Sequence, residues 1–207
     1  MKETWYDRNI LPWLLDLACG ISPVRYQREK VVPKAVGHVL EIGIGTGLNA
    51  PHYDKQKAHT IVGLDPALRL HRLAAKRIAQ AGLKIELVGL SAERIPYPDR
   101  TFDSVLMTYT LCSIPDPVSA LKEMHRVLKP EGRLVFCEHG KAPDASVHRW
   151  QNRLTPWWKK IAGGCHLNRD IPALLEEAGF KCEAIETMYI PGPRPLTYNY
   201  WGLAKPA

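Results

Sequence analysis

A glycine-rich turn that directly follows a short apolar run constrains this chain more than any other feature. Residues 38–42 read His-Val-Leu-Glu-Ile, which is typical of a buried strand, and residues 41–47 read Glu-Ile-Gly-Ile-Gly-Thr-Gly. Glycines at alternate positions let the backbone turn tightly and approach a bound molecule where side chains would collide. The turn therefore predicts an α/β domain whose first strand ends at a ligand site.

Strand-like and helix-like segments alternate along the rest of the chain. Further strands are expected at residues 60–65, 84–88, 102–107 and 132–138. Helices are expected at residues 67–81, 117–128, 146–162 and 171–178. Two late strands, at residues 181–190 and 196–204, are joined by a loop too short for a crossover, so they should pair antiparallel.

This order predicts the fold class α/β, with a doubly wound, Rossmann-like sheet that is mostly parallel and has one reversed strand. The chain has 207 residues, of which 45% are hydrophobic and 24% charged, so one globular domain is expected. Within residues 1–207 we expect an N-terminal helical lid at residues 1–37, a cofactor-binding half at residues 38–139 and a substrate half at residues 140–207.

The composition argues against several classes of protein. The five cysteines are scattered, odd in number and without C-x-x-C spacing, so neither a disulfide framework nor a metal site is expected. Such cysteine usage predicts a reducing, cytoplasmic compartment. The first residues lack the order of a secretory signal. The net charge of +7 is dispersed along the chain, so nucleic acid is not expected as a partner.

The most apolar stretch near the start is residues 10–24, which is too short to span a bilayer of about 30 Å. Residues 10–17 should form a lid helix or a packed edge. A peripheral contact of this helix with the inner face of a membrane is the alternative. The sequence does not indicate the oligomeric state.

Two acidic residues stand where a nucleotide-like cofactor needs them. Asp65 ends the second predicted strand, where a carboxylate binds a ribose diol in related folds. Glu41 lies two residues before the first glycine and can accept a charged amino group, whereas a carboxylate there repels a pyrophosphate. The spacing Gly-x-Gly-x-Gly also differs from the Gly-x-Gly-x-x-Gly form of dinucleotide-binding proteins, so a nicotinamide cofactor is disfavoured.

Several segments together resemble the class I S-adenosylmethionine-dependent methyltransferases, closest to the branch that includes quinone-biosynthesis enzymes. These segments are residues 40–47, 63–66, 91–99, 102–103 and 128–132. The resemblance implies a seven-stranded sheet whose last strand is antiparallel, with S-adenosylmethionine as cofactor and S-adenosylhomocysteine as product. It implies cofactor contacts at Glu41, Gly43, Gly45, Gly47, Asp65, Pro66, Ser91, Ala92, Glu93 and Thr108. Many relatives carry an aspartate where this chain has Ser91.

A second resemblance concerns the acceptor. Residues 111–113, 138–139 and 164–169 are similar to the small thiol methyltransferases of the methyltransferase-like group. This implies a small-molecule substrate, a thiol such as sulfide or methanethiol. C-, O- or N-methylation of a quinone precursor or a lipid headgroup is the alternative, and a cofactor-binding regulatory module without turnover is a third hypothesis.

Candidate catalytic groups follow the fourth and fifth predicted strands. His139 and His166 are candidate bases because an ordinary histidine pKa near ~6.5 allows proton transfer at neutral pH, although a hydrogen-bonded wall residue is the alternative for each. Tyr109 is expected in the substrate pocket, better placed as a wall than as an acid. Cys112 and Cys165 are either reactive thiols or small buried hydrophobic residues.

Overall fold

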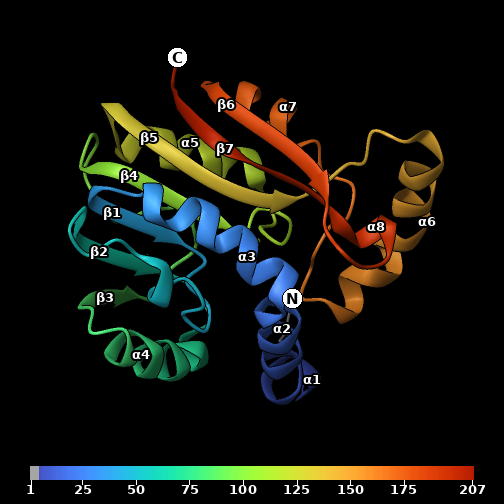
Figure 1. The fold of residues 1–207 in the computed structure, drawn as a ribbon, viewed down its shortest axis with the longest axis horizontal. Coiled ribbons are helices and arrows are strands. Elements are labelled where there is room, and N and C mark those ends of the chain that lie inside the picture. The colour runs from blue at the N-terminus through green and yellow to red at the C-terminus, as the bar shows by residue number, and fades with distance from the viewer. Residues whose placement is uncertain (1–4) are drawn as a thin grey trace.

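Residues 5–207, which the computed structural model describes, form one seven-stranded sheet covered by helices (Figure 1). The strands are β1 (Gly37–Ile42), β2 (Ala58–Leu64), β3 (Ile85–Val88), β4 (Phe102–Thr108), β5 (Leu128–His139), β6 (Phe180–Tyr189) and β7 (Tyr198–Pro206). Their order across the sheet is β3-β2-β1-β4-β5-β7-β6. Pairs among β1 to β5 are parallel, whereas β7 pairs antiparallel with both β5 and β6. The predicted doubly wound α/β sheet with its last strand reversed is confirmed.

Helices cover both faces of this sheet, which explains why its central strands are apolar on both sides. One face packs against α3 (Ser22–Val31) and α4 (His71–Gln80), and the other against α5 (Pro117–Val127) and α7 (Ile171–Glu177) (Figure 1). Alternate residues of one strand therefore enter different cores. Leu106 belongs to the α3 side, and its neighbour Met107 belongs to the α5 side.

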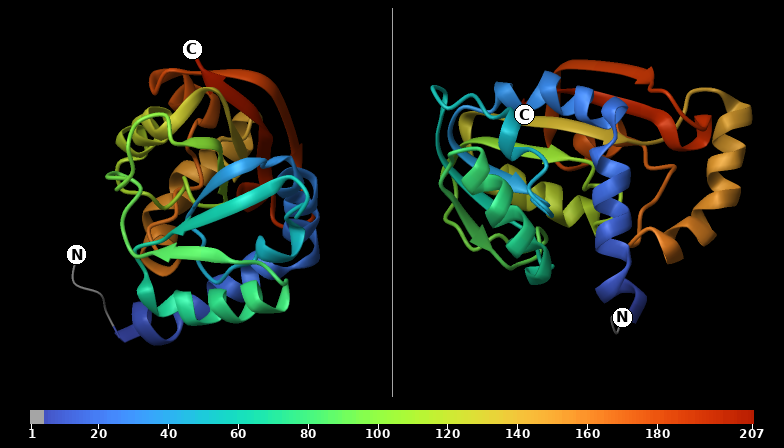
Figure 2. Two further views of the ribbon diagram at one scale, coloured as in Figure 1. Left: turned by 90° about the vertical axis from the view of Figure 1, so that its left-hand side faces the viewer. Right: turned by 60° about the horizontal axis from the view of Figure 1, so that its bottom comes forward.

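The N-terminal helices project from the body of the molecule. They are α1 (Trp5–Asn9) and α2 (Leu11–Gly20), and they lie beside the C-terminal end of α6 (Ala145–Ile161) (Figures 1 and 2). The Tyr6 hydroxyl on α1 donates a hydrogen bond to the carbonyl oxygen of Ile161 over 2.8 Å. Among residues 5–207, no helix combines the length and the apolar composition needed to cross a bilayer.

Some element boundaries differ from those expected. The helix predicted at residues 67–81 is divided into a short 3-10 turn (Leu68–Leu70) and α4. Strand β5 begins at Leu128, four residues earlier than expected, because Leu128 already pairs with Phe102 of β4. Residues 196–197 were expected in a strand but end the short helix α8 (Arg194–Thr197), where Pro195 occupies the first turn and needs no N–H partner there.

Candidate functional site

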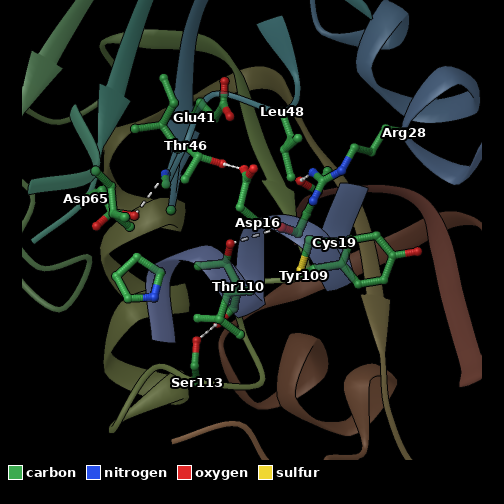
Figure 3. A pocket seen from close by; sticks show the side chains of 17 residues that line it. Asp16, Cys19, Arg28, Glu41, Thr46, Leu48, Asp65, Tyr109, Thr110 and Ser113 are labelled. Atoms are coloured by element: carbon green, nitrogen blue, oxygen red, sulfur yellow. Dashed lines mark hydrogen bonds between the residues drawn. The ribbon is translucent and has the colours of Figure 1, made fainter. Parts of the chain in front are cut away.

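A cleft opens beyond the carboxyl ends of β1, β2 and β4. Because β1 has β2 on one side and β4 on the other, this is the switch point where ligands bind in open α/β sheets. Two adjoining cavities form the cleft, and they share the lining residues Pro12, Leu15, Gly43, Asp65, Leu70, Thr110 and Ser113. Figure 3 shows the side chains around the first of them. Helix α2 closes one side, which agrees with a lid.

The glycine turn forms the floor of the cleft. Gly43, Gly45 and Gly47 have φ of +68°, +52° and +79°, a region that side chains disfavour. A Cβ at Gly43 would come within 2.3 Å of the Thr110 side chain. A Cβ at Gly45 would meet no atom closer than 3.8 Å, so its absence leaves room for a ligand above the turn. The backbone therefore forms a cradle that only glycines permit.

Asp65 follows β2 and faces this turn. Its Oδ2 accepts a hydrogen bond from the Gly45 N–H over 2.9 Å, and its Oδ1 accepts one from the Ala67 N–H over 2.8 Å. Burial raises the pKa of this carboxyl, although both backbone hydrogen bonds act against that rise. Each carboxylate oxygen can accept more than one hydrogen bond, so the pair remains able to bind a diol. Pro66 lines the same part of the cleft.

Glu41 ends β1 in a buried position, with 1% of its surface exposed. Asn49 Nδ2 donates to Oε1 over 2.9 Å and the Tyr53 hydroxyl donates to Oε2 over 2.6 Å. Burial outweighs these hydrogen bonds and raises the pKa of the Glu41 carboxyl to about 7. A cationic ligand group beside this carboxylate would offset the cost of its burial.

Arg28 is a residue of the cleft that the sequence did not indicate. Its Nη1 donates to Asn49 Oδ1 over 2.7 Å and to Thr108 Oγ1 over 2.5 Å, and its guanidinium lies 5.2 Å from the centre of the Tyr109 ring. Its Nε is buried and has no hydrogen-bond partner among the described residues. Arg28 lines the cleft together with Glu41 (Figure 3). The two side chains suit the carboxylate and the amino group of an amino acid.

The opposite end of the cleft is a more apolar slot. It is lined by Ser91 and Ala92, which were expected there, and by Leu70, Leu90 and Ile114. Glu93 has another role, because its carboxylate accepts from the Ser91 hydroxyl and from the Asp116 N–H. It therefore fixes the two loops that border the slot.

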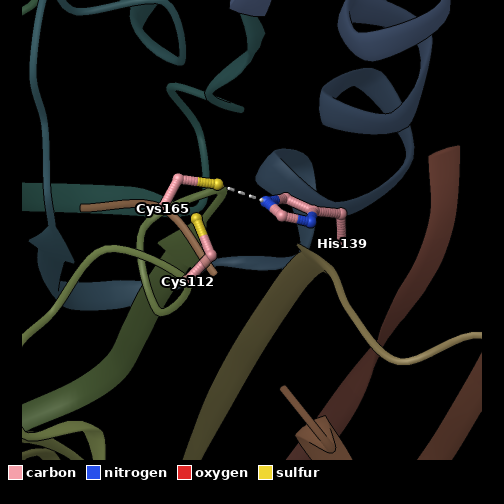
Figure 4. A group of neighbouring side chains, drawn as sticks. All are labelled: Cys112, His139 and Cys165. Carbon is pink, nitrogen blue, oxygen red and sulfur yellow. Dashed lines mark hydrogen bonds between the residues drawn. The ribbon is translucent and has the colours of Figure 1, made fainter. Parts of the chain in front are cut away.

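Three side chains that the sequence singled out converge near the carboxyl ends of β4 and β5 (Figure 4), and none of them is among the residues that line the cleft. Cys112 follows β4, His139 ends β5 and Cys165 follows α6. Cys165 Sγ lies 3.2 Å from His139 Nε2. A hydrogen bond from the Cys112 thiol, together with the charge of His139, lowers the pKa of the Cys165 thiol to about 4. Burial lowers the pKa of His139, but Cys165 and Glu138 outweigh it and raise that pKa above its ordinary value.

The chain segments that carry this cluster are tied together. Glu138 Oε1 accepts from the N–H groups of Thr110 and Leu111, and the Arg169 guanidinium donates to the carbonyl oxygens of Leu111 and Ile114. The His166 N–H donates to the Cys112 carbonyl over 2.8 Å, and its ring Nδ1 lies 3.2 Å from the same oxygen. His166 therefore supports the segment that carries Cys112.

Tyr109 is part of the wall, as expected from its position after β4. Its hydroxyl donates to Asn199 Oδ1 over 2.6 Å, and burial raises its pKa well above the ordinary value. Its φ of +53° is unusual for a residue with a bulky side chain, and such backbone outliers cluster at functional sites.

Helix α2 is held at the cleft by an ion pair of Asp16, a residue that the sequence did not indicate. The Asp16 carboxylate on α2 binds the Arg77 guanidinium through two contacts of 2.6 and 2.9 Å and accepts a hydrogen bond from Thr46. Cys19, one turn further along α2, lines the cleft. No local pattern marks these residues, because their partners come from distant parts of the chain.

Comparisons with known proteins agree with this geometry. The family model of the methyltransferase domain matches residues 40–136. The chain is 37% identical to thiol S-methyltransferase TMT1B of Rattus norvegicus over 146 residues, which are 69% of this chain and 59% of the relative. It is 31% identical to thiol S-methyltransferase TMT1A of Homo sapiens, covering 84% of this chain and 73% of the relative.

A relative with another acceptor is similar as well. Demethylmenaquinone methyltransferase of Thermobifida fusca is 29% identical, over 72% of this chain and 63% of the relative. Among solved structures, an S-adenosylmethionine-dependent methyltransferase of Thermotoga maritima, described as a possible histamine N-methyltransferase, superimposes with a TM-score of 0.68 at 22% identity and covers 98% of both chains. The chain spans about three fifths of the length of the TMT1B relatives.

Proposed function

Since the chain belongs to the S-adenosylmethionine-dependent methyltransferase family, we propose that it transfers the methyl group of that cofactor to a small thiol, such as sulfide or methanethiol. The observation that carries the choice of a thiol is the cluster of Cys112, His139 and Cys165 behind the cleft wall. The cluster adjoins the cleft, because Ser113, which lines the cleft, directly follows Cys112, and Gly163, which also lines it, lies two residues before Cys165.

Different residues of the cleft would bind different parts of the cofactor. Arg28 would bind the carboxylate of the methionine part, and Glu41 its amino group. Asp65 would bind the ribose hydroxyls, with the turn of Gly43, Gly45 and Gly47 beneath them. The slot at Ser91 and Ala92 would hold the adenine. S-adenosylmethionine supplies an electrophilic methyl group on a sulfonium, and no covalent help from the protein is needed for its transfer.

The work left to the protein is to align the acceptor and to remove its proton. Methyl transfer is an in-line displacement, so positioning contributes much of the acceleration. A thiol with an ordinary pKa near ~8.5 needs only mild deprotonation, whereas an alcohol needs a far stronger base. We propose that His139, together with its partner Cys165, takes up this proton.

His166 and Tyr109 are proposed to act by positioning. His166 holds the Cys112 segment through the Cys112 carbonyl. The Tyr109 ring lies beside the Arg28 guanidinium, and its hydroxyl donates a hydrogen bond to Asn199. Thr108, which was expected to touch the cofactor, would instead orient Arg28 through its hydroxyl oxygen.

A second candidate acceptor is a quinone precursor or a lipid headgroup, and one observation favours it. Trp13 and Leu17 on α2 expose 62% and 70% of their surfaces, and Trp157 and Ile161 on α6 expose 71% and 56%. Lys160 lies 5.0 Å from the Trp157 ring centre, so this apolar face carries positive charge. We propose a peripheral contact of this face with an anionic membrane.

A panel of acceptors tests the proposed function. Purified protein is incubated with methyl-labelled cofactor and with ethanethiol, sulfide, a quinol or ethanolamine, and labelled products are separated. Methylated thiol with no methylated quinol or amine supports the thiol. Methylated quinol or amine alone would overturn it and leave the second candidate.

A vesicle experiment tests the membrane contact separately. The protein should sediment with vesicles that contain phosphatidylserine, and Trp13→Ser together with Trp157→Ser should abolish this. Equal sedimentation of the variant would exclude the apolar face as the contact.

A further inference from the structure

We infer that Cys112, His139 and Cys165 form a binding site for a divalent cation of the zinc class, with a fourth position for the sulfur of the acceptor. The assignment of the fourth position rests on the proposed thiol methylation, whereas the metal site itself stands on the geometry of this cluster alone. The sequence did not indicate the site, because the three residues are separated by more than twenty positions in the chain and show no ligand spacing.

The ligand atoms are close enough to share one ion. The two Sγ atoms and the histidine nitrogen all lie within 4.8 Å of one another, and Cys165 Sγ is 3.2 Å from His139 Nε2 (Figure 4). Zinc bonds of about 2.3 Å to sulfur and about 2.0–2.1 Å to nitrogen place the ligand atoms of a tetrahedral site roughly 3.3–3.9 Å apart. The cluster therefore needs only small side-chain shifts to close around zinc.

The backbone holds the three ligands in this arrangement. The Cys112 carbonyl accepts the His166 N–H over 2.8 Å, which joins the segment after β4 to the segment after α6. The Tyr109 N–H donates to the Cys137 carbonyl over 2.8 Å, which joins the end of β4 to the end of β5. Ligands from three segments are therefore already fixed relative to one another, so little ordering would accompany metal binding.

The charges around the cluster point independently to a cation. Glu138, next to His139 in the chain, is fully buried, and its Oε2 has no hydrogen-bond partner among the described residues. The Arg169 guanidinium is directed to the carbonyl oxygens of Leu111 and Ile114. A buried carboxylate oxygen without a donor is costly. A divalent cation held by Cys112, His139 and Cys165 would place positive charge beside this oxygen.

Two cysteines and one histidine are a ligand set that catalytic zinc uses, and such sites keep one position open. At the fourth position the acceptor R–SH would bind through sulfur and release its proton to solvent. The sulfur then forms a bond to the methyl carbon, while the bond between that carbon and the sulfonium breaks and its electron pair stays on the cofactor sulfur. The neutral product R–S–CH₃ is a weaker ligand and leaves. In the metal-bound protein His139 is thus a metal ligand and not the base. Coordination of the acceptor sulfur to the metal is then what causes the acceptor thiol to lose its proton.

Metal binding is measured first, without acceptor or cofactor. The protein is treated with chelator, dialysed against zinc or cobalt chloride at micromolar concentration, and analysed for metal content and for the near-ultraviolet charge-transfer band of cobalt bound to thiolate. We expect about one equivalent per chain. Cys112→Ser and Cys165→Ser should lose the band and bind metal at least ~100-fold more weakly, because the loss of a direct ligand should cost more than the ~10- to 100-fold that an outer-shell partner contributes.

The control variant is Cys182→Ser. Cys182 lies on β6 and is partly buried, outside the cluster, so this variant should bind metal like the wild type. Thermal melts establish that each serine variant is folded. Absence of metal from the wild type, or equal binding by folded Cys165→Ser, would overturn the site and leave His139 as the proton acceptor of the proposed reaction.

The fourth position is tested on the cobalt-loaded protein. Ethanethiol should shift the charge-transfer band, because a further sulfur enters the coordination sphere, whereas ethanol at the same concentration should not. If cobalt binds and ethanethiol changes nothing, the metal is structural and its role in holding the acceptor is wrong. If ethanethiol shifts the band but no thiol is methylated, the proposed function fails while the metal site remains.

Discussion

Replacement of Glu41 by glutamine should make the protein more stable and a poorer binder of its cofactor. The Glu41 carboxyl is 1% exposed, and its pKa is raised from 4.5 to about 7 by burial. Because the folded pKa lies above the unfolded one, this group favours folding most at low pH, and that contribution is lost as the pH rises from 4.5 through 7. The cost of keeping Glu41 as a carboxylate is below about 1 kcal/mol at pH 5 and about 3 kcal/mol at pH 8.

Glu41→Gln removes this cost and keeps the shape of the side chain. Asn49 can still donate to the amide oxygen, and the Tyr53 hydroxyl can rotate to accept from the amide nitrogen. About 3 kcal/mol corresponds to a rise of roughly 5–10 °C in melting temperature at pH 8 for a domain of this size, and the rise should be much smaller at pH 5. At pH 8 the cofactor should bind about 10- to 100-fold more weakly, because its amino group loses a charged acceptor.

Thermal melts at both pH values and calorimetric titration with S-adenosylhomocysteine measure the two effects of Glu41→Gln. The control is Glu183→Gln, because Glu183 lies on β6 in ion pairs with Arg133 and Lys205, away from the cleft. It should gain no stability and bind the cofactor normally. If Glu41→Gln melts at the wild-type temperature at pH 8, the cost assigned to burial of the Glu41 carboxylate is wrong. If it binds S-adenosylhomocysteine as tightly as wild type, the assignment of Glu41 to the amino group is refuted.

Three further predictions concern the same cleft. Asp65→Ala should weaken binding of S-adenosylhomocysteine by about 1–3 kcal/mol in calorimetric titration, because the ribose loses a charge-assisted acceptor; unchanged affinity would place the ribose elsewhere. The wild type should bind S-adenosylhomocysteine but not NAD in the same titration, because Glu41 repels a pyrophosphate, and tighter NAD binding would contradict this. His139→Ala should lower thiol turnover about 10²-fold while cofactor affinity stays close to wild type, and full turnover by a folded variant would remove His139 from the reaction.

The sequence predicted the fold well because each strand and its following turn carry their signals locally. Gly43 and Gly45 after β1 and the aspartate after β2 are such signals, and all three line the cleft, whereas Gly47 lies against Ala74 of α4. Boundaries depended on tertiary contacts and were predicted less well. The start of β5 is set by pairing of Leu128 with Phe102, a contact that periodicity along one segment does not contain.

The parts of the site that escaped prediction are those assembled from distant segments. Arg28 meets Thr108 across 80 positions of the chain, and Cys165 meets His139 across 26. Thr108, His139 and Cys165 were each singled out in the sequence, but nothing local indicated which residues they meet. Arg28 carries no pattern at all, because α3 would form a helix of the same kind without it. Cysteine spacing could not indicate the proposed metal site for the same reason, since spacing reports only ligands that one loop supplies.

The ion pair between Asp16 and Arg77 gives α2 a specific energetic link to the rest of the domain, because it joins α2 directly to α4. The two side chains are 18% and 29% exposed and form two parallel contacts, so the pair should contribute about 0.5–1.5 kcal/mol rather than the smaller value of an exposed pair. Arg77 lowers the pKa of Asp16 from 3.8, so the contribution is complete above that value and is lost only as the pH falls through the lowered pKa.

Asp16→Ala should therefore loosen α2 at every pH from 6 to 9 and speed dissociation of S-adenosylhomocysteine about 3- to 10-fold, with little change in its association rate. Stopped-flow measurements on Asp16→Ala, Arg77→Ala and the double variant separate the pair from the individual side chains, since two changes that remove one interaction are not additive. The exposed pair of Arg25 and Glu29 on α3 is the control, and its removal should leave dissociation unchanged. If the single effects of Asp16→Ala and Arg77→Ala add in the double variant, the ion pair does not hold the lid, and the apolar contacts of Pro12 and Leu15 must do so.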